Sequence, residues 1–186
     1  MYHTPPAAAR SIEWYTPPEI LARVRAVLER IHLDPASCPR AQRVVQAQVY
    51  YRKGDGALRR RWSGQTWLNP PFELPALAQF VRKLIAEHEA RRVPAAVVLV
   101  PGDRTNQPWC QELIAAAAIC WPKRRIAFWN RHPSLLVTGN PRPSLIGYLG
   151  PHVEWFVDVF ADLGVITPAG DVMHGARLAL RRELAA

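Results

Sequence analysis

A four-residue run, Asn69-Pro70-Pro71-Phe72, carries groups suited to holding an amine on a planar ring. A side-chain amide oxygen and a fixed backbone carbonyl can each accept a hydrogen bond from such an NH2 group. Together they would favour a pyramidal nitrogen whose lone pair is free to attack an electrophile such as a methyl sulfonium. Two successive prolines stiffen the loop and remove two N–H donors. The aromatic ring can stack on the ring that bears the amine.

The same run can also arise by chance, because this sequence has 18 prolines among 186 residues. Composition alone should produce a match to so loose a pattern in roughly 1–3% of such chains. The rest of the chain must therefore decide between an active-site loop and an ordinary proline-rich loop after a strand.

Metal chemistry is not predicted. The three cysteines are widely spaced and form no Cys-x-x-Cys pair, and the six histidines show no ligand spacing. We expect structural thiols, buried or half-buried, at Cys38, Cys110 and Cys120.

The chain is strongly basic, with a formal net charge of +9 and a pI of about 10.2. Arginine supplies most of this charge, since the only lysines are Lys53, Lys83 and Lys123. Guanidinium groups suit phosphate, so the composition favours a nucleic-acid partner. A GC-rich genome or a thermophilic origin would also enrich arginine.

Basic residues gather in three clusters, Arg52-Lys53, Arg59-Arg60-Arg61 and Lys123-Arg124-Arg125. Phosphate contacts are the functional hypothesis for such clusters, and a solvated protein face is the alternative. The predicted nucleic-acid contacts are Arg59, Arg60, Arg61, Lys123 and Arg124.

Hydrophobic periodicity predicts the elements that must position these residues. We expect helices from an N-cap at residue 16 to residue 28, and at 39–48, 73–92, 105–120, 153–163 and 173–186. We expect strands at 31–34, 66–68, 95–100, 125–129 and 144–149, with a long loop at 130–143. This alternation predicts an α/β fold with a mostly parallel, doubly wound sheet and helices on both faces.

Two local patterns support these helices. Thr16-Pro17-Pro18-Glu19 predicts a helix start, with threonine as N-cap and glutamate completing a capping box. The expected helix at 73–92 keeps a 3.6-residue period through Leu74, Leu77, Ala78, Val81, Leu84, Ile85 and His88.

Asp34 and Asn69 each follow an expected strand. Ligands of open α/β sheets bind beyond the carboxyl ends of the strands. We therefore expect both residues on the same rim of the sheet, where they would form a single active site.

The length favours a single domain over residues 1–186, with residues 1–12 as a flexible tail. No apolar run approaches the ~20 residues that span a bilayer, and the first ten residues lack the apolar core of a secretory signal. The sequence thus predicts a cytoplasmic protein without a membrane partner.

The chain resembles the small phage-type DNA N6-adenine methyltransferases, relatives of the Dam-like enzymes, from about residue 13 to residue 149. Short blocks in a specific order carry this resemblance. They are Glu13-Trp14-Tyr15-Thr16-Pro17-Pro18, Leu33-Asp34-Pro35-Ala36-Ser37, Asp55-Gly56-Ala57-Leu58, Trp62, Trp67-Leu68-Asn69-Pro70-Pro71-Phe72, Val100-Pro101, Thr105, Trp109 and Arg125-Ile126-Ala127-Phe128.

The resemblance implies a Rossmann-like methyltransferase fold, S-adenosylmethionine as methyl donor and adenine in DNA as acceptor. It also implies that the enzyme flips the target base out of the stack. In the loop at 69–72, Asn69 and the Pro70 carbonyl would hold the amine, Pro71 would stiffen the loop, and Phe72 would stack on the base.

Cofactor contacts are likewise implied by the resemblance. Asp34, Pro35, Ala36 and Ser37 would form the cofactor loop, with Asp34 near the methionine or ribose moiety. The cofactor's methionine end would be lined by Tyr15, Thr16 and Pro17. Asp55 would hold the cofactor's ribose or adenine amine, although a turn between two glycines is the favoured interpretation.

One departure and several alternatives stay open. Many methyltransferases have a glycine-rich cofactor loop where Cys38-Pro39-Arg40 stands here. A basic nucleic-acid-binding module without catalysis is therefore one alternative. Methylation of cytosine N4 or of a protein glutamine amide is another. Trp62, Trp121 and Trp129 could stack bases or pack in the core. A monomer is slightly favoured.

Overall fold

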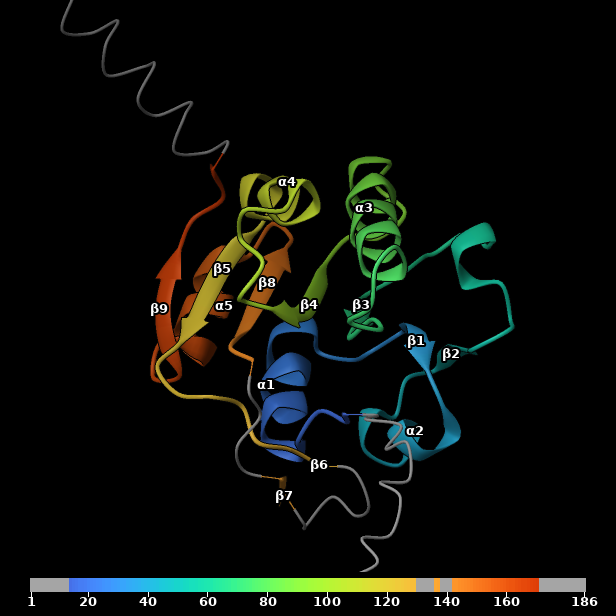
Figure 1. Ribbon diagram of the computed structural model, residues 1–186, viewed down its shortest axis with the longest axis horizontal. Coiled ribbons are helices and arrows are strands. Elements are labelled where there is room, and N and C mark those ends of the chain that lie inside the picture. The colour runs from blue at the N-terminus through green and yellow to red at the C-terminus, as the bar shows by residue number, and fades with distance from the viewer. Residues whose placement is uncertain (1–13, 130–135, 138–141, 171–186) are drawn as a thin grey trace, which may run out of the picture.

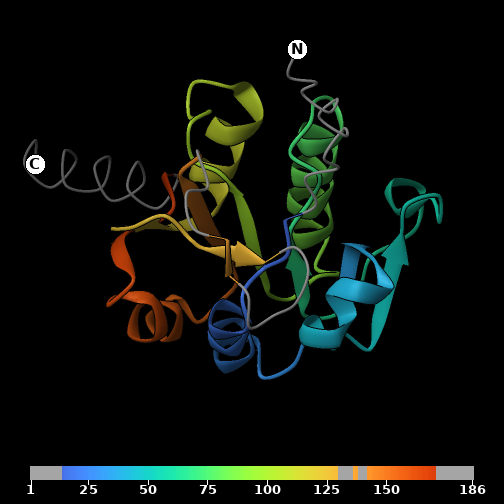
Figure 2. The same cartoon turned by 60° about the horizontal axis from the view of Figure 1, so that its bottom comes forward.

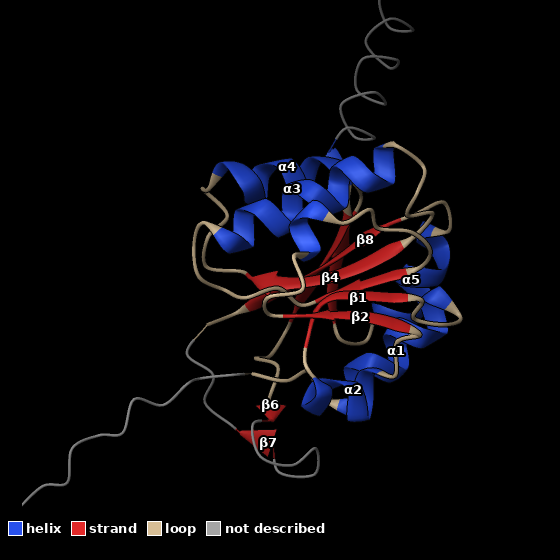
Figure 3. Cartoon of the chain, turned by 90° about the vertical axis from the view of Figure 1, so that its right-hand side faces the viewer, coloured by secondary structure: helices blue, strands red, loops and turns tan. Residues whose placement is uncertain are grey.

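The computed structural model describes residues 14–129, 136–137 and 142–170, which form one main sheet between two layers of helices (Figures 1 and 3). Seven strands hydrogen-bond in the order β2-β1-β3-β4-β8-β5-β9. Their bounds in that order are Val49–Arg52, Leu33–Ser37, Thr66–Leu68, Ala96–Pro101, Ser144–Leu149, Ala118–Pro122 and Gly164–Thr167.

Five of the seven strands point the same way. The β1 strand pairs in parallel with β2 and β3, and β3 pairs in parallel with β4. The β8 strand is antiparallel to both β4 and β5, so β5 regains the common direction, and β9 runs against β5. The prediction of a mostly parallel sheet is confirmed.

Helices cover both faces and bury two separate cores. The first core lies under α1 (Pro18–Leu28), α2 (Pro39–Val45) and α5 (Val153–Phe160). The second lies under α3 (Ala76–Glu89) and α4 (Pro108–Ala116), which Figure 3 shows on the opposite side of the sheet from α1 and α2. Strand side chains alternate between them: Trp67 enters the first core and Leu68 the second. This is a Rossmann-like α/β fold.

The order of the strands reverses at β1, which makes this place the topological switch point of the sheet. From β1 the chain passes to β2 on one side of β1 and later to β3 on the other side. Helices α2 and α3 follow these strands on opposite faces. In open α/β sheets such a switch point is where ligands bind, beyond the carboxyl ends of the strands. Here it lies between the ends of β1 and β3.

Several expected elements are confirmed. Both β3 and β8 have the predicted bounds, and β4 is shifted by one residue, with all six of its residues buried. The predicted apolar face of α1 is buried, at Ile20, Leu21, Val24, Val27 and Leu28.

The prediction of one helix over 105–120 is wrong. Helix α4 ends at Ala116, and the next residues form strand β5 in the middle of the antiparallel part of the sheet. A continuous apolar run fits a buried strand as well as a buried helix, and periodicity does not separate them. The short strands β2 and β9 were missed, because each lies on an edge of the sheet with a half-exposed pattern.

The starts of two helices also differ. Helix α3 begins at Ala76, after a cis Leu74-Pro75 bond, and Leu74 is 47% exposed instead of continuing the apolar stripe. The N-cap of α1 is Pro17, not Thr16, and it makes no side-chain capping bond. Thr16 is buried and its hydroxyl contacts another side chain, so no capping box forms with Glu19.

The expected strand at 31–34 is observed as β1, which runs through Pro35 to Ser37 instead of ending at Asp34. Asp34 therefore lies within the strand. Its pairing with β2 shifts register between Asp34 and Ser37, where the missing proline N–H is tolerated. The expected strand at 125–129 is reduced to β6 (Phe128–Trp129). It pairs with β7 (Leu136–Val137) outside the main sheet (Figure 3).

The expected helix at 173–186, the expected tail at 1–12 and most of the expected loop at 130–143 lie outside the described residues. No helix within the described ranges is long and apolar enough to cross a membrane.

Candidate active site

A short extended segment before α1 is anchored to β6. Tyr15 and Trp129 exchange two backbone hydrogen bonds, with N–O distances of 2.9 and 3.0 Å, and their ring centroids lie 4.6 Å apart. The indole Nε1 of Trp129 also donates to the carbonyl of Thr16 at 2.9 Å. These bonds fix Thr16, which is 4% exposed, next to the end of β3.

Asn69 is the first residue after β3 and faces this segment. Its Nδ2 donates to the Thr16 hydroxyl at 3.2 Å. The other amide atom, Oδ1, is buried and has no hydrogen-bond partner among the described residues. Leaving such an acceptor unsatisfied costs about 1–3 kcal/mol. The contact with Thr16 orients the amide so that Oδ1 is available to a donor.

The rest of the predicted loop differs in exposure. Pro70 is buried, Pro71 is exposed, and Phe72 is half-buried against the first core. Stacking of Phe72 on a base stays a prediction.

Asp34 lies on the same side of the sheet as Asn69. Its neighbour Leu33 enters the second core, so Asp34 points toward the first core and α2. It is 2% exposed. Its carboxylate accepts hydrogen bonds from Gln42 Nε2 at 2.9 Å and from Ala36 N at 3.3 Å. Burial raises the pKa of Asp34 from 3.8 to about 6, although bonds from Ser37, Ala36 and Gln42 act in the opposite direction.

Gln42 of α2 ties the predicted cofactor loop together and was missed by sequence reasoning. Its Nε2 also lies 2.7 Å from the Ser37 hydroxyl, and its Oε1 accepts from Ala47 N at 2.9 Å. No local signal marks this residue, because a glutamine on a short amphipathic helix is usually solvent-facing. Only the fold brings it to Asp34.

Cys38 contacts both helix α2 and the extended segment before α1. Its Sγ accepts from Ala41 N at 3.4 Å, which caps α2, and lies 3.7 Å from the Tyr15 hydroxyl. A capped helix that starts at Pro39 therefore replaces the glycine-rich turn that many methyltransferases have. The structure thus brings Thr16 into contact with Asn69, and Tyr15 into contact with Cys38 at the end of the segment at 34–38.

Asp55 lies in the turn after β2 and its carboxylate is already engaged. Oδ2 accepts from Arg52 N at 2.8 Å, and this bond holds the pKa of Asp55 below its usual value, helped by the charges of Arg52 and Arg60. These contacts support the turn interpretation.

The basic segment from β2 through η1 (Ala57–Arg59) projects from one edge of the sheet (Figures 1 and 2). Its predicted DNA contacts, Arg59, Arg60 and Arg61, are exposed. Arg60 lies 5.1 Å from the Tyr51 ring centroid and donates to the Asp55 carbonyl.

Lys123 and Arg124 are also exposed and follow the carboxyl end of β5, so they share this side of the sheet with the end of β2. Trp62 and Trp129 are 0% and 1% exposed and pack in the interior, which rules out base stacking in this conformation. Trp121 is half-buried, and its Nε1 donates to Thr167 Oγ1 at 3.0 Å.

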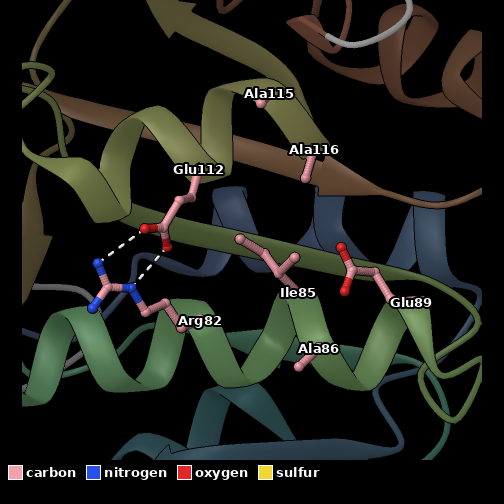
Figure 4. Close-up of a pocket in the computed structure, with 7 residues that line it drawn as sticks. All are labelled: Arg82, Ile85, Ala86, Glu89, Glu112, Ala115 and Ala116. Carbon is pink, nitrogen blue, oxygen red and sulfur yellow. Dashed lines mark hydrogen bonds and ion pairs between the residues drawn. The ribbon is translucent and has the colours of Figure 1, made fainter.

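Two surface hollows lie elsewhere. One of about 270 Å³ lies between α3 and α4, where Arg82 and Glu112 pair at 2.8 and 2.9 Å (Figure 4). The other, of about 230 Å³, includes Gln65 and Ala95, which precede β3 and β4, so it lies at the opposite edge of the sheet. Neither contains Asp34 or Asn69. The candidate site is therefore defined by the polar groups that converge at the switch point.

A family model described as DNA N-6-adenine-methyltransferase (Dam) matches residues 4–157, more than four fifths of the chain. The chain belongs to this family. Membership of the Dam family confirms the resemblance drawn from the sequence, and the match includes the whole candidate site.

No curated protein matches the chain. Among solved structures, a dimethyladenosine transferase from Plasmodium falciparum is similar to it at 13% identity, with a TM-score of 0.43. The alignment covers 78% of this chain and 66% of that one, so the chain spans slightly less than two thirds of that protein's length.

Within the described ranges, no group of three or more histidine, cysteine or acidic side chains is placed to hold a metal ion. The cysteines there are unpaired: Cys110 and Cys120 are buried and Cys38 is half-buried. Burial raises the pKa of both Cys110 and Cys120 to about 11. The prediction of structural thiols is confirmed.

Proposed function

We propose that this chain transfers a methyl group from S-adenosylmethionine to N6 of adenine in DNA, and that Asn69-Pro70-Pro71-Phe72 is its active-site loop. The single observation that carries the proposal is the buried, unpartnered Oδ1 of Asn69. A buried acceptor without a partner is rare in native proteins, and none of the described residues supplies a donor here, so a bound ligand is the donor that we propose. An exocyclic amine is such a donor.

Asn69 Oδ1 accepts one hydrogen of the amine and the Pro70 carbonyl accepts the other. The contact between Asn69 Nδ2 and Thr16 fixes the amide before the base arrives, so little reorganisation is needed during the reaction. Pro71 and the half-buried Phe72 stiffen the loop, and Phe72 stacks on the base. The loop needs no general base, because the N6 proton leaves after the nitrogen has become cationic.

S-adenosylmethionine, when bound, supplies the methyl group from its sulfonium. The residues at the end of β1 suit its polar groups. Asp34 is buried beside Ser37 and lacks a cationic partner among its hydrogen-bond donors, which explains its raised pKa. An α-ammonium or ribose hydroxyl would satisfy the carboxylate, with Tyr15 closing the other side near Cys38. Asp55 is the weakest of the proposed contacts, because the turn already uses its carboxylate.

DNA binding follows from charge and from the nature of the acceptor. The exposed residues Arg59, Arg60 and Arg61 on the β2–η1 segment contact phosphates, as do Lys123 and Arg124 after β5. In a stacked duplex the lone pair of N6 lies between neighbouring bases and one N6 hydrogen is base-paired, so the base is flipped into the site. The positive charge favours nucleic acid over a protein glutamine as acceptor.

The test pairs methyl transfer with cofactor binding. Asn69→Ala should reduce transfer of labelled methyl groups to DNA at least a hundredfold, the scale seen when one oriented polar group is removed from an active site. Calorimetric affinity for S-adenosylmethionine should change by less than about threefold, because Asn69 contacts the acceptor. Asn106→Ala, at an exposed asparagine before α4, is the matched control and should retain full activity.

Each other result has a definite meaning. Near-wild-type turnover by the Asn69 variant would refute the role of the loop. A wild-type protein that binds no S-adenosylmethionine would instead favour a non-catalytic DNA-binding module.

A further inference from the structure

Three buried polar side-chain atoms have no hydrogen-bond partner in the part of the chain that the structure describes: Asn69 Oδ1, Trp109 Nε1 and Ser144 Oγ. The proposed amine contact accounts for the first. Ser144 is 6% exposed, so its hydroxyl is removed from water without compensation. An unsatisfied group of this kind needs an explanation.

Ser144 lies at the same edge of the sheet as the active-site loop. It is the first residue of β8 and pairs with Pro101, the last residue of β4. Because β8 runs antiparallel to β4, the start of β8 lies at the carboxyl ends of β3 and β4. The bond from Gly102 N to the Pro143 carbonyl, 2.8 Å long, holds this corner together.

Ser144 also shares a face with Asn69. Along β8, Leu145 enters the second core and Ile146 the first, so Ser144 points to the side of the first core. Trp67 enters the first core, and Asn69 lies two residues after it and bonds to Thr16, next to α1. Trp109 belongs to the second core, on the opposite face.

The spacing between the two residues suits one purine. The β3 and β8 strands lie on either side of β4, and the register places Ser144 two residues farther toward the rim than Asn69. Strand spacing and rise then put the two backbones roughly 12 Å apart. An adenine about 4 Å from its amine to the opposite ring nitrogen, with a hydrogen bond of about 2.9 Å at each end, spans roughly 10 Å.

Resting on the proposed function, we propose that the Ser144 hydroxyl donates a hydrogen bond to N3 of the flipped adenine, the ring nitrogen opposite the amine held by Asn69. N3 is an acceptor in adenine. In cytosine, the ring nitrogen opposite the amine is N1, which carries the sugar and accepts no hydrogen bond. Ser144 is thereby a specificity-determining residue that favours adenine N6 over cytosine N4.

The test is a double-mutant cycle in which one change is made in the protein and the other in the target base. The substrate is an unmethylated oligonucleotide that contains the site that the wild-type protein methylates. On it, Ser144→Ala should lower kcat/KM by about tenfold, the usual effect of one lost hydrogen bond in a binding site. Replacing the target adenine by 3-deazaadenine should lower the wild-type value by a similar factor, because N3 becomes C–H. The variant should show no further loss on the 3-deaza substrate.

Two controls separate this contact from general damage. With 7-deazaadenine the full tenfold effect of Ser144→Ala should persist, since N7 does not contact Ser144. Ser63→Ala, at an exposed serine, should leave every rate unchanged. In the free protein, Ser144→Ala should leave the midpoint of thermal unfolding unchanged or raise it, because the hydroxyl has no partner there to lose.

If kcat/KM of Ser144→Ala on the 3-deaza substrate fell by the product of the two single losses, the role of Ser144 would be overturned. A lowered midpoint of thermal unfolding for Ser144→Ala would overturn it too. If the wild-type protein methylated no DNA at all, the proposed function would fail, and this inference with it. Wild-type methylation of adenine together with multiplicative losses would overturn only the inference.

Discussion

Asp34→Asn should make the free protein more stable at neutral pH, although it removes a proposed cofactor contact. Burial raises the pKa of Asp34 from 3.8 to about 6. At 1.36 kcal/mol per pKa unit, this difference means that the ionised carboxylate costs the fold about 3 kcal/mol above pH 6. Asparagine at this position is uncharged and removes that cost. It has a single acceptor oxygen, so it loses one of the two hydrogen bonds from Gln42 and Ala36, which is worth about 1 kcal/mol. The expected net gain is about 2 kcal/mol.

The pH dependence has a defined sign. An acid whose pKa is raised by folding contributes stability that is fully present below its unfolded pKa, here 3.8, and is lost as the pH rises through its folded pKa, about 6. Wild type therefore loses the Asp34 contribution between these values, and the variant has none to lose. The pH-dependent increase in the variant's unfolding free energy relative to wild type should be about half complete at pH 5 and complete near pH 7.

Urea unfolding of both proteins at pH 5.0 and 7.5 measures this difference. Asp158→Asn, at an exposed aspartate on α5, removes the same charge and serves as the matched control. A variant that is no more stable than wild type at pH 7.5, or whose advantage does not grow from pH 5.0, would refute the assignment of a buried, uncompensated carboxylate. Calorimetry should show weaker S-adenosylmethionine binding by the same variant, which would separate its functional role from its stability effect.

Two further predictions concern the groups around the loop. Thr16→Val should lower kcat about tenfold through loss of the Asn69 bond and leave S-adenosylmethionine affinity within about twofold; a large fall in that affinity would instead make Thr16 a cofactor contact. Replacing Arg59, Arg60 and Arg61 by alanine should weaken DNA binding and reduce the slope of log Kd against log salt by up to about 2.7. An unchanged slope in a salt titration would place these arginines outside the DNA interface.

The position of the candidate loop at the end of a buried strand was predictable because its signals are local. Asn69 follows a three-residue buried strand whose bounds are confirmed, and parallel strands must bring their ends to one edge. The basic clusters and the structural cysteines are likewise matters of composition and spacing.

Residues whose roles depend on distant partners could not be found this way. Thr16 has the local signature of an N-cap, yet burial beside Asn69 gives its hydroxyl another partner 53 residues away. Gln42 and Ser144 look like ordinary polar residues until the fold places them at Asp34 and at the end of β4. The apolar run of strand β5 continues directly from α4, so the sequence pattern predicts one helix there instead of a helix and a strand.

The most direct test of the central claim is nucleoside analysis of DNA after incubation with the wild-type protein and S-adenosylmethionine labelled on its methyl group. We predict label in N6-methyldeoxyadenosine, with at least a hundredfold less after Asn69→Ala. Label in N4-methyldeoxycytidine, or in protein alone, would contradict the claim.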